Sequence, residues 1–365
     1  MRPQPPTGPS PLSSPRPRID PGAAPDPDLP CRARGQKMNT LASLYASLTA
    51  GRPAMATAVE QHLTDDTHWR VAHPINDLQG RAAVLEDFLL PLAAALPDLE
   101  RRRFIEIPGE YQGARWIAGT GYLTGTFTRG FFGLPATGRT LYLRYTELAR
   151  IDGEHIADYY LIPDFLDVML QAGVYPLRPG WGHAGLVMPP ASMDGLCRED
   201  ADPVHTAGSV QLVMDMLDCL RRFDGIRLDS MDLENYWHPD FMWYGPAGIG
   251  TTRGIAGFRR HHQGPFVSAF PDRDVDHHAC TVASGDYVAT GGWPHMHGTH
   301  LGGGWLGLPA SGKRRELRVM DLWRREGALL KENWVAIDIP QILLQMGLDV
   351  FAQMRELQQV ESPHG

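Results

Sequence analysis

Residues that can exchange protons near neutral pH are concentrated in the second half of this 365-residue chain. Nine of its fifteen histidines lie between residues 205 and 300, and His295, His297 and His300 fall in or beside one expected strand. Asp338 comes at the end of a later strand, directly before an apolar helical segment. Histidine titrates near neutrality, and burial raises the pKa of a carboxylic acid toward that range. These residue types therefore suit general acid–base chemistry.

Two interpretations of Asp338 remain open. As a catalytic residue it would take a proton from a carbon next to a carbonyl group and return it to the developing alkoxide, with His300 assisting. As a structural residue it would cap the following helix, since aspartate is a preferred N-cap. Asp164 is its counterpart in the first half, with the same two interpretations. Alternate strand residues share a face, so the residues expected beside the second aspartate are Glu332, Trp334 and Ala336, and those beside the first are Asp158, Tyr160 and Ile162.

The strand histidines allow a further hypothesis. His295 and His297 could line a pocket and polarise a carbonyl group, or lie half-exposed on the sheet. Together with His300 they have a spacing that metals accept, which would allow metal-assisted hydrolysis. No carboxylate at tight spacing completes that set, so we predict no metal and no cofactor. The pairs His261–His262 and His277–His278 are expected mostly in solvent.

Aromatic residues and one repeated ion pair complete the candidates. Either a wall for a flat, multi-ring substrate or ordinary core could be formed by Trp243, Tyr244, Trp293, Trp305 and Trp334. Arg318 and Asp321 are three positions apart on one expected strand, so their side chains point to opposite faces. Arg144 and Glu147 repeat this arrangement in the first half, which favours a structural pair or an interface over catalysis.

The elements that must position these residues occur twice. Matched strings are separated by 174 residues, the distance from Asp164 to Asp338. They are Gly80–Asp98 with Gly254–Asp272, Leu134–Gly138 with Leu308–Gly312, and the two aspartates with the helices that follow them. A constant offset over most of both halves indicates a duplicated domain.

Each copy has the same order of expected elements. Apolar residues at helical spacing come first, and a second helix follows with Pro91 or Pro265 at a kink or in the first turn of a new helix. Period-two segments broken by Gly and Pro come next: 114–126, 140–150 and 155–162, then 287–297, 316–324 and 329–337. Each copy ends in an apolar helix, 165–172 or 341–350. Helices on one face of a curved antiparallel sheet predict an α+β cone that encloses a pocket.

Composition limits the function and sets the boundaries. The formal charge of −8 argues against a nucleic-acid or anionic-membrane partner, and no apolar run is long enough to span a membrane. The four cysteines show no paired spacing of the kind found in disulfide frameworks, which favours a location in the reducing cytoplasm. Residues 1–37 hold 11 of the 31 prolines and are expected to be a disordered tail or an extension upstream of Met38. The expected domains are 38–174 and 204–354, with a linker at 175–203 and a tail at 355–365.

The second copy holds an ordered series of short motifs. They are Ala269-Phe270-Pro271-Asp272, Gly285-Asp286-Tyr287-Val288-Ala289, Gly298-Thr299-His300-Leu301-Gly302, Gly307-Leu308-Pro309, Glu332-Asn333-Trp334 and finally Asp338. This series resembles the SnoaL-like polyketide cyclases of the nuclear transport factor two-like superfamily. The first copy keeps the frame but has Phe127 where the second has His300.

The resemblance implies a cone with a mostly apolar pocket and metal-free intramolecular aldol chemistry. In that family a single aspartate from the last strand is the acid–base group, and Asp338 matches it. We therefore expect the second copy to act on a hydrophobic carbonyl-containing small molecule, by cyclisation or a related isomerisation or hydration. The first copy, with Asp164, Tyr160 and Phe127 as its candidates, is expected to be degenerate. The alternative is a non-catalytic binding protein with two hydrophobic cones.

The resemblance also bears on assembly. Members of the superfamily often pair through their open sheets, so the two copies are expected to form an intramolecular pseudo-dimer. A higher homo-oligomer is left open.

Overall fold

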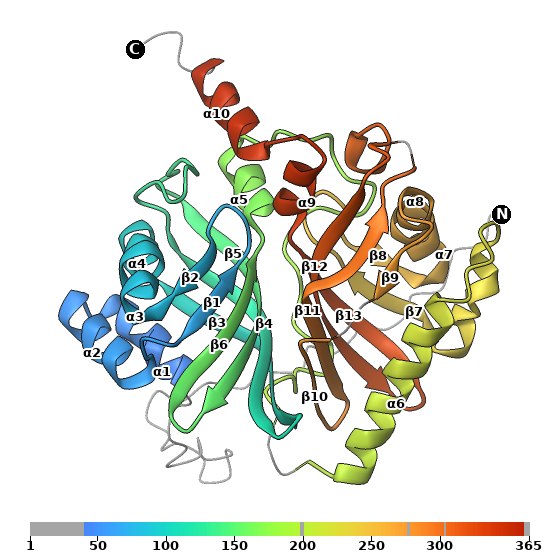
Figure 1. Ribbon diagram of the computed structural model, residues 1–365, viewed down its shortest axis with the longest axis horizontal. Coiled ribbons are helices and arrows are strands. Elements are labelled where there is room, and N and C mark those ends of the chain that lie inside the picture. Colours follow the sequence, from blue (N-terminus) through green and yellow to red (C-terminus); the bar gives the residue numbers. More distant parts are fainter. Residues whose placement is uncertain (1–39, 198–200, 276–277, 303, 361–365) are drawn as a thin grey trace, which may run out of the picture. The chain divides into compact units, whose positions relative to one another are not determined.

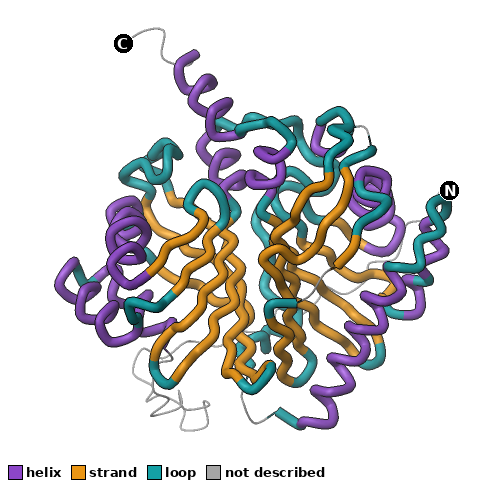
Figure 2. The backbone as a smooth tube through the Cα atoms, in the orientation of Figure 1, coloured by secondary structure: helices purple, strands orange, loops and turns teal. Residues whose placement is uncertain are grey.

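The computed structural model describes residues 40–197, 201–275, 278–302 and 304–360. The expectations for residues 1–37, for His277 and for residues 361–365 fall outside these ranges. The described part contains two sheets, one in each copy, with helices packed against one face of each sheet (Figure 1). In Figure 2 the strands of the two sheets face each other and the helices lie toward the outside. The α+β fold expected for each copy is confirmed.

The first copy forms a six-stranded sheet in the order β2-β1-β6-β5-β4-β3. Its strands are β1 (His68–Val71), β2 (Asn76–Gln79), β3 (Glu100–Tyr111), β4 (Ala114–Thr126), β5 (Thr140–Asp152) and β6 (His155–Pro163). Neighbours are antiparallel except for β1 and β6, which run parallel. The helices are α1 (Thr40–Ala46), α2 (Arg52–His62), α3 (Gly80–Val84), α4 (Leu90–Ala95) and α5 (Phe165–Ala172). A π-helical turn, Leu85–Leu89, joins α3 to α4.

The second copy repeats this order as β8-β7-β13-β12-β11-β10, with β9 also pairing with β11. Its strands are β7 (Trp237–Tyr244), β8 (Thr252–Arg253), β9 (Asp274–Val275), β10 (Cys280–Ser284), β11 (Tyr287–Thr299), β12 (Arg314–Glu326) and β13 (Leu329–Ile337). Its helices are α6 (Pro203–Leu220), α7 (Gly254–Phe258), α8 (Gly264–Ala269), α9 (Ile339–Gln345) and α10 (Val350–Val360). A second π-helical turn, Arg259–Gln263, stands 174 residues after the first.

Local sequence explains several of these boundaries. Pro91 and Pro265 lie in the first turn of α4 and α8, where a missing amide hydrogen costs little. The expected single helix 341–350 is instead two helices, because Gly347 takes a left-handed φ of 95° between α9 and α10. The helix α10 also continues to Val360, through residues expected in a tail.

The same pair of hydrogen bonds forms at equivalent positions in the two copies. Asp98 accepts hydrogen bonds from the amide and hydroxyl of Thr126, at 2.6 and 2.7 Å. Asp272 accepts the equivalent bonds from Thr299, at 2.7 and 2.6 Å. These bonds fix where β3 and β9 begin relative to the neighbouring strand, so positions in the two copies can be compared residue by residue.

The two sheets pack on each other through a shared apolar layer that includes Trp116, Tyr122, Tyr244, Met320 and Trp334. Two backbone contacts across this layer are reciprocal. The carboxylate of Asp164 accepts from the amide of Ala247 at 2.8 Å, and that of Asp338 accepts from the amide of His73 at 3.0 Å. Because these donors and acceptors are each 174 residues apart, the two halves fit an intramolecular pseudo-dimer.

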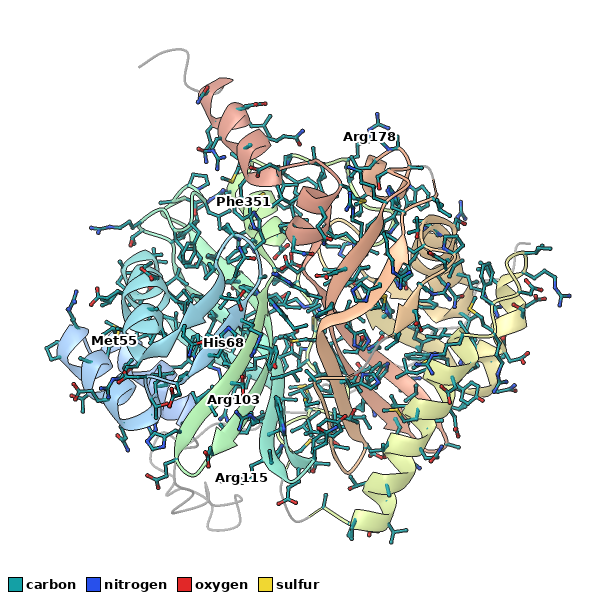
Figure 3. All side chains as sticks on the ribbon, viewed as in Figure 1. Met55, His68, Arg103, Arg115, Arg178 and Phe351 are labelled. Atoms are coloured by element: carbon teal, nitrogen blue, oxygen red, sulfur yellow. The ribbon has the colours of Figure 1, made fainter. Side chains whose placement is uncertain are left out.

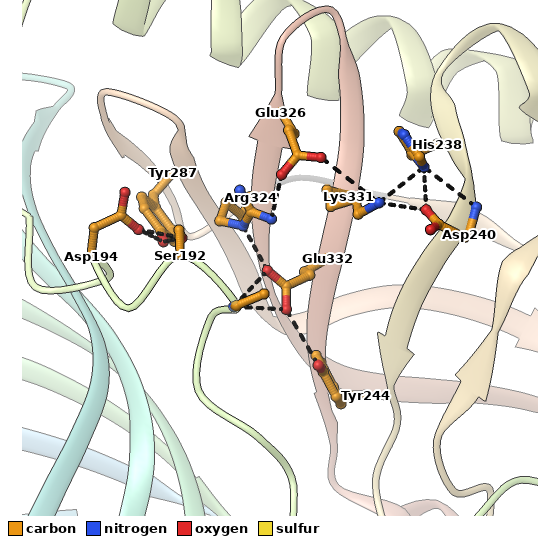
Figure 4. Close-up of polar contacts among 11 residues, drawn as sticks. Ser192, Asp194, His238, Asp240, Tyr244, Tyr287, Arg324, Glu326, Lys331 and Glu332 are labelled. Atoms are coloured by element: carbon orange, nitrogen blue, oxygen red, sulfur yellow. Dashed lines mark hydrogen bonds and ion pairs between the residues drawn. The ribbon is translucent and has the colours of Figure 1, made fainter. Parts of the chain in front are cut away.

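The segment that joins the copies lies against this interface (Figure 4). The hydroxyl of Tyr287 donates to Asp194, and the backbone amide of Ala191 donates to Glu332 at 3.2 Å. The indole of Trp334 donates to the carbonyl of Met188 at 2.9 Å. The linker is therefore held in place by side chains of the second copy, beside the buried ion pair of Glu332 with Arg324.

The last helix crosses to the first copy. Phe351 of α10 packs against Phe165 and His73, with ring centroids 6.2 and 5.6 Å apart (Figure 3). None of the helices within the described ranges is long and apolar enough to cross a membrane.

Candidate functional site

A cavity of about 310 Å³ lies inside the cone of the second copy, between its sheet and its helices. Most of its lining is apolar and aromatic, including Trp237, Trp243, Phe258, Phe266 and Trp323. Polar side chains enter this lining at a few places, namely His262, Gln263, Arg273, His278, His295, Asp321 and Asn333, with Arg221 and Asp274 also among the lining residues. An apolar pocket with a small number of convergent polar groups is the usual form of a small-molecule site.

Asp321 is the acid of this cavity. Asp321 lies on β12, and its carboxylate accepts a hydrogen bond from the side-chain amide of Asn333, on the neighbouring β13, at 3.3 Å. Within the described residues no cation lies at ion-pair distance from its carboxylate. Asp321 lines the cavity, and burial raises the pKa of its carboxyl group to about 7. At neutral pH the group can therefore both accept and donate a proton.

The equivalent acid of the first copy has a different environment. Glu147 is fully buried and pairs with Arg101, whose guanidinium lies over the ring of Tyr45 at 4.8 Å. The hydroxyl of Tyr159 also donates to Glu147 and lies 2.9 Å from the hydroxyl of Tyr45. Although burial opposes its charge, the Glu147 carboxylate raises the pKa of Arg101 above its ordinary value. In the first copy, a network of large side chains therefore surrounds the acid and neutralises its charge.

Smaller residues stand at the matching positions of the second copy. Arg101, Tyr159, Tyr45 and Tyr145 correspond to Val275, Asn333, Cys219 and Val319. The strand register supports the first of these pairs, since Arg101 lies opposite Leu123 and Val275 lies opposite Met296, at the same distance before the Thr126 and Thr299 turns. Where the first copy has one cation and three phenol rings, the second copy has a cavity and an acid with no counter-ion among the described residues.

The π-helical turn delivers two further polar groups. Phe88 and Leu89 of the first turn correspond to His262 and Gln263 of the second. The ring of His262 stacks on Trp243 with centroids 4.0 Å apart, and burial followed by the charge of Arg273 lowers its pKa to about 3. Within the described residues, neither the buried Nδ1 of His262 nor the buried Oε1 of Gln263 has a hydrogen-bond partner. Such turns recur at functional sites because the inserted residue redirects side chains.

Asp338 lies elsewhere. It is 1% exposed and caps α9 by accepting from the amide of Gln341 at 3.2 Å. It also pairs with Arg318 at 3.1 Å and accepts from His73 of the first copy. Burial raises its pKa to about 6 despite the opposing charge of Arg318. The carboxylate is thus in a water-poor position, but at the contact between the copies and outside the cavity lining.

The orientation of the side chains on β13 explains why Asp338 lies outside the cavity. Trp334 and Ala336 share one face of β13, as expected, and that face belongs to the layer between the two sheets. The cavity is lined by the intervening residues Asn333, Val335 and Ile337. Similarly, Arg318 and Asp321 do leave β12 on opposite faces, and it is Asp321 that reaches the cavity.

The candidate histidines are dispersed. His295 is buried and lines the cavity, with its ring centroid 5.1 Å from that of His278. His297 lies 3.6 Å from Glu316 near the surface. His300 is fully buried against Phe270, accepts from the amide of Ser311 at 3.2 Å and is outside the cavity lining. Among the residues that the structure describes, no three His, Cys, Asp or Glu side chains are placed to hold a metal ion.

The aromatic candidates divide between cavity, core and interface. Trp243 lines the cavity, and Trp305 packs in the core against Phe270 at 5.2 Å. Tyr244 stacks on Trp334 between the two sheets at 5.2 Å. Trp293 also lies in this layer, where the Arg318 guanidinium covers its ring at 4.5 Å.

The candidates of the first copy lie at a helix cap, at the interface between the sheets and in the core. Asp164 caps α5 through the amide of Asp167 at 3.2 Å, in addition to its contact with the second copy. Tyr160 packs on Trp293 at the interface, at 6.2 Å. Phe127 is fully buried, and its amide donates to the carbonyl of Arg139, as the amide of His300 does to Lys313. Phe127 therefore takes the position of His300 as a core residue.

The site residues that sequence reasoning missed are Asp321, His262, Gln263, Arg273, His278 and Asn333. His262 and His278 were expected in solvent, and Asp321 was assigned to a structural pair. A usable pattern existed in the duplication itself. At Phe88, Leu89 and Leu99 the first copy is apolar, whereas the second copy has histidine, glutamine and arginine. Polar residues that replace core residues in only one copy indicate where that copy has a different task.

The raised pKa of Asp321 predicts a pH dependence of stability. The folded state holds a proton on this group up to about pH 7, whereas an unfolded aspartate loses it near pH 4. Wild-type stability therefore falls as pH rises between these values, because the unfolded chain binds fewer protons. Asp321→Asn removes this loss, so urea unfolding at pH 8 should show a gain on the order of 2 kcal/mol over wild type, allowing for water in the cavity. The gain should shrink as pH falls and be absent below about pH 4. Asp274→Asn, at the exposed edge of the cavity, should show no such pH-dependent gain, and equal gains for both variants would contradict the assignment.

Removal of the Asp338 carboxylate should destabilise the fold. Asp338→Ala deprives the amides of Gln341 and His73 of their acceptor and leaves the Arg318 guanidinium without its partner. We expect a loss of about 3 kcal/mol in the free energy of unfolding, measured by urea titration. Asp349→Ala, which removes the α10 cap at Phe351 and Ala352 and an exposed pair with Arg355, should cost about 1 kcal/mol. A loss at Asp338 no larger than at Asp349 would show that the contact between copies contributes little.

Comparison with known proteins agrees with this architecture. The SnoaL-like polyketide cyclase profile matches residues 41–172, and the SnoaL-like domain profile matches residues 216–333. No curated protein matches the chain.

Similar solved structures each correspond to part of this chain. A candidate SnoaL-like polyketide cyclase from Jannaschia sp. CCS1 shares 19% identity over 42% of this chain and 99% of its own, with a TM-score of 0.34. IdmH, a candidate polyketide cyclase from Streptomyces antibioticus, shares 22% identity over 38% of this chain and 99% of its own, with a TM-score of 0.32. TsrD from Streptomyces laurentii shares 26% identity over 39% of this chain and 96% of its own, with a TM-score of 0.31. With a SnoaL-like match in each half and the same fold in both halves, the chain is a tandem duplication of SnoaL-like domains.

Proposed function

We propose that the second copy is an acid–base enzyme of the polyketide-cyclase type that needs no metal and acts on a hydrophobic carbonyl compound, with Asp321 as its acid–base group. One observation supports this above all others. A carboxyl group with a pKa of about 7 lies in the wall of an apolar cavity and has no counter-ion among the described residues. General acid–base catalysis is most effective when the pKa of the group lies near the working pH.

The proposed chemistry uses one proton twice. The Asp321 carboxylate takes a proton from the carbon next to the substrate carbonyl, which leaves an enolate. The enolate carbon attacks a second carbonyl carbon of the same molecule, so that a carbon–carbon bond forms and the attacked oxygen becomes an alkoxide. The protonated Asp321 returns its proton to that alkoxide, which restores the carboxylate. No oxidant, reductant or second substrate is required.

Other cavity residues have supporting roles in this proposal. Because its pKa is lowered to about 3, His262 is neutral at physiological pH and can hydrogen-bond a carbonyl oxygen without adding a charge. Trp243 and Phe266 each stack on this histidine, at 4.0 and 5.5 Å, and belong to the apolar lining of the cavity. A planar aromatic or fused-ring substrate fits these walls, and its carbonyl groups match the few polar positions.

Proton abstraction can be tested before the natural substrate is known. The protein is incubated in D₂O with aryl alkyl ketones, and mass spectrometry follows deuterium entering the position next to the carbonyl. We expect exchange above the buffer rate for ketones that quench the fluorescence of the cavity tryptophans. Quenching without exchange across the panel would contradict catalysis and favour a binding protein.

A further inference from the structure

Arg273 is a cation in the cavity wall, and none of its contacts with the described residues is to a carboxylate. It follows the Asp272 turn, and its Nη2 donates to the carbonyl of Leu220, at the end of α6, at 2.9 Å. Its guanidinium carbon lies 5.8 Å from the ring centroid of Phe223, which also lines the cavity. These contacts fix the side chain, because the end of a helix and an aromatic face both attract a cation.

No carboxylate among the described residues lies within ion-pair distance of Arg273. Burial lowers the pKa of Arg273 from its ordinary value, and arginine nonetheless stays charged in proteins. Its charge also reaches the cavity interior, since it contributes to the lowered pKa of His262. A half-buried cation of this kind is unfavourable unless an anion joins it.

The first copy shows what has changed. Leu99 stands at the position of Arg273, and the cation of that copy lies two residues later, at Arg101, where it pairs with Glu147. Arg273 lies directly before β9 and, like Val275 within that strand, lines the cavity. In the second copy the cation therefore stands two residues earlier, at Arg273, and Val275 occupies the position next to the acid. The ion pair of the first copy is split into a separate cation and a separate acid, both facing the cavity.

We propose that the substrate of this cavity is a hydrophobic keto acid whose carboxylate is bound by Arg273 while its carbonyl end lies toward Asp321. This proposal rests on the proposed function and names the substrate class. Guanidinium binds carboxylate through paired, charge-assisted hydrogen bonds, which fix both the position and the direction of the ligand. The apolar walls accept the ring system between these two ends.

Binding of two matched probes tests the proposal without any turnover. Naphthoate and its uncharged amide have nearly the same shape, and calorimetry on the full-length chain gives the affinity of each. The Asp321→Asn variant is measured alongside wild type so that the charge of the acid does not affect the comparison. In both proteins we expect naphthoate to bind about tenfold more tightly than the amide, as one charge-assisted contact predicts.

Variants then assign the preference to one residue. Arg273→Leu, which restores the residue of the first copy, should remove the preference for naphthoate and change amide affinity by less than about twofold. Arg221→Leu, at the edge of the cavity and already paired with Asp218, should keep it. Arg273→Lys retains the charge and should keep part of the preference, which covers the case in which the leucine variant fails to fold.

Several outcomes would overturn the proposal: no naphthoate binding at millimolar concentration, equal affinities in wild type, a preference that survives in Arg273→Leu, or an equal loss of both affinities. The last would mean that Arg273 only holds the end of α6. Failure of deuterium exchange with intact naphthoate preference would instead reject the proposed function and retain an anion-binding pocket.

Discussion

Asp321→Asn should lower the rate of ketone deuterium exchange by about 10³-fold while leaving ketone binding intact. The substitution keeps the size of the side chain and can keep the contact with Asn333, but it removes the group that accepts the proton. Because the pKa of Asp321 is about 7, the wild-type rate should rise with pH through neutrality as the carboxylate forms. Mass-spectrometric exchange rates between pH 5.5 and 8.5 measure both effects.

Two carboxylates serve as controls for this result. Glu147→Gln alters the matching acid of the first copy, which is already neutralised by Arg101, and should leave exchange unchanged. Asp338→Asn alters the helix cap between the copies and should change stability without changing the exchange rate of the folded fraction. If the Asp321→Asn variant were active and the Asp338→Asn variant inactive, Asp338 and not Asp321 would be the catalytic residue.

Arg101→Val introduces the residue that the second copy has at the matching position, Val275. It should lower the free energy of unfolding by about 4 kcal/mol. It leaves the Glu147 carboxylate fully buried with a tyrosine hydroxyl as its remaining described donor, and it removes the cation that covers Tyr45. Breaking a buried ion pair from one side is costly because the other charge stays in a low dielectric. Urea unfolding of the full chain measures the loss.

A second variant and a neighbouring residue make this test specific. Arg101→Val combined with Glu147→Gln removes both charges and should recover at least half of the loss. Arg103→Val, on the same strand, breaks a partly exposed pair with Glu106 and should cost about 1 kcal/mol. Equal effects at positions 101 and 103 would show that the buried network does not stabilise the first copy.

Much of the fold could be predicted from the sequence, because it depends on patterns that repeat. The 174-residue offset gave two domains, and period-two segments gave the long strands of each sheet. The two positions of proline in the second helix also matched the start of α4 and α8. These features are local or depend on a comparison within the chain, so no tertiary contact had to be known.

The site could be predicted only in part, because alternation tells which residues share a face and not what that face meets. Trp334 and Ala336 were grouped correctly, yet their face packs against the first copy. Only the packing of one sheet on the other decides this, and it placed Asn333 and Asp321 in the cavity instead. Asp338 satisfied the capping interpretation, with an additional contact to His73 that the sequence gives no means to foresee.

The π-helical turn had a similar effect on the histidines. Adjacent histidines were expected to point in different directions, and His262 lines the cavity whereas His261 does not. Which of the two enters the cavity depends on the extra residue in the turn, and ordinary helical periodicity does not include it. Comparison with Phe88, a core residue in the same place, identifies the inward position.

The reciprocal contacts of Asp164 with Ala247 and of Asp338 with His73 have a consequence for how such a molecule can diversify. In an assembly of two identical subunits every amino-acid change appears on both sides of the axis, so a change that fills one hollow also fills its mate. Joining the subunits end to end removes that restriction. One copy can then lose its cavity and serve as structural support only. The other copy can keep an empty cavity, together with the loss of folding stability that the cavity causes.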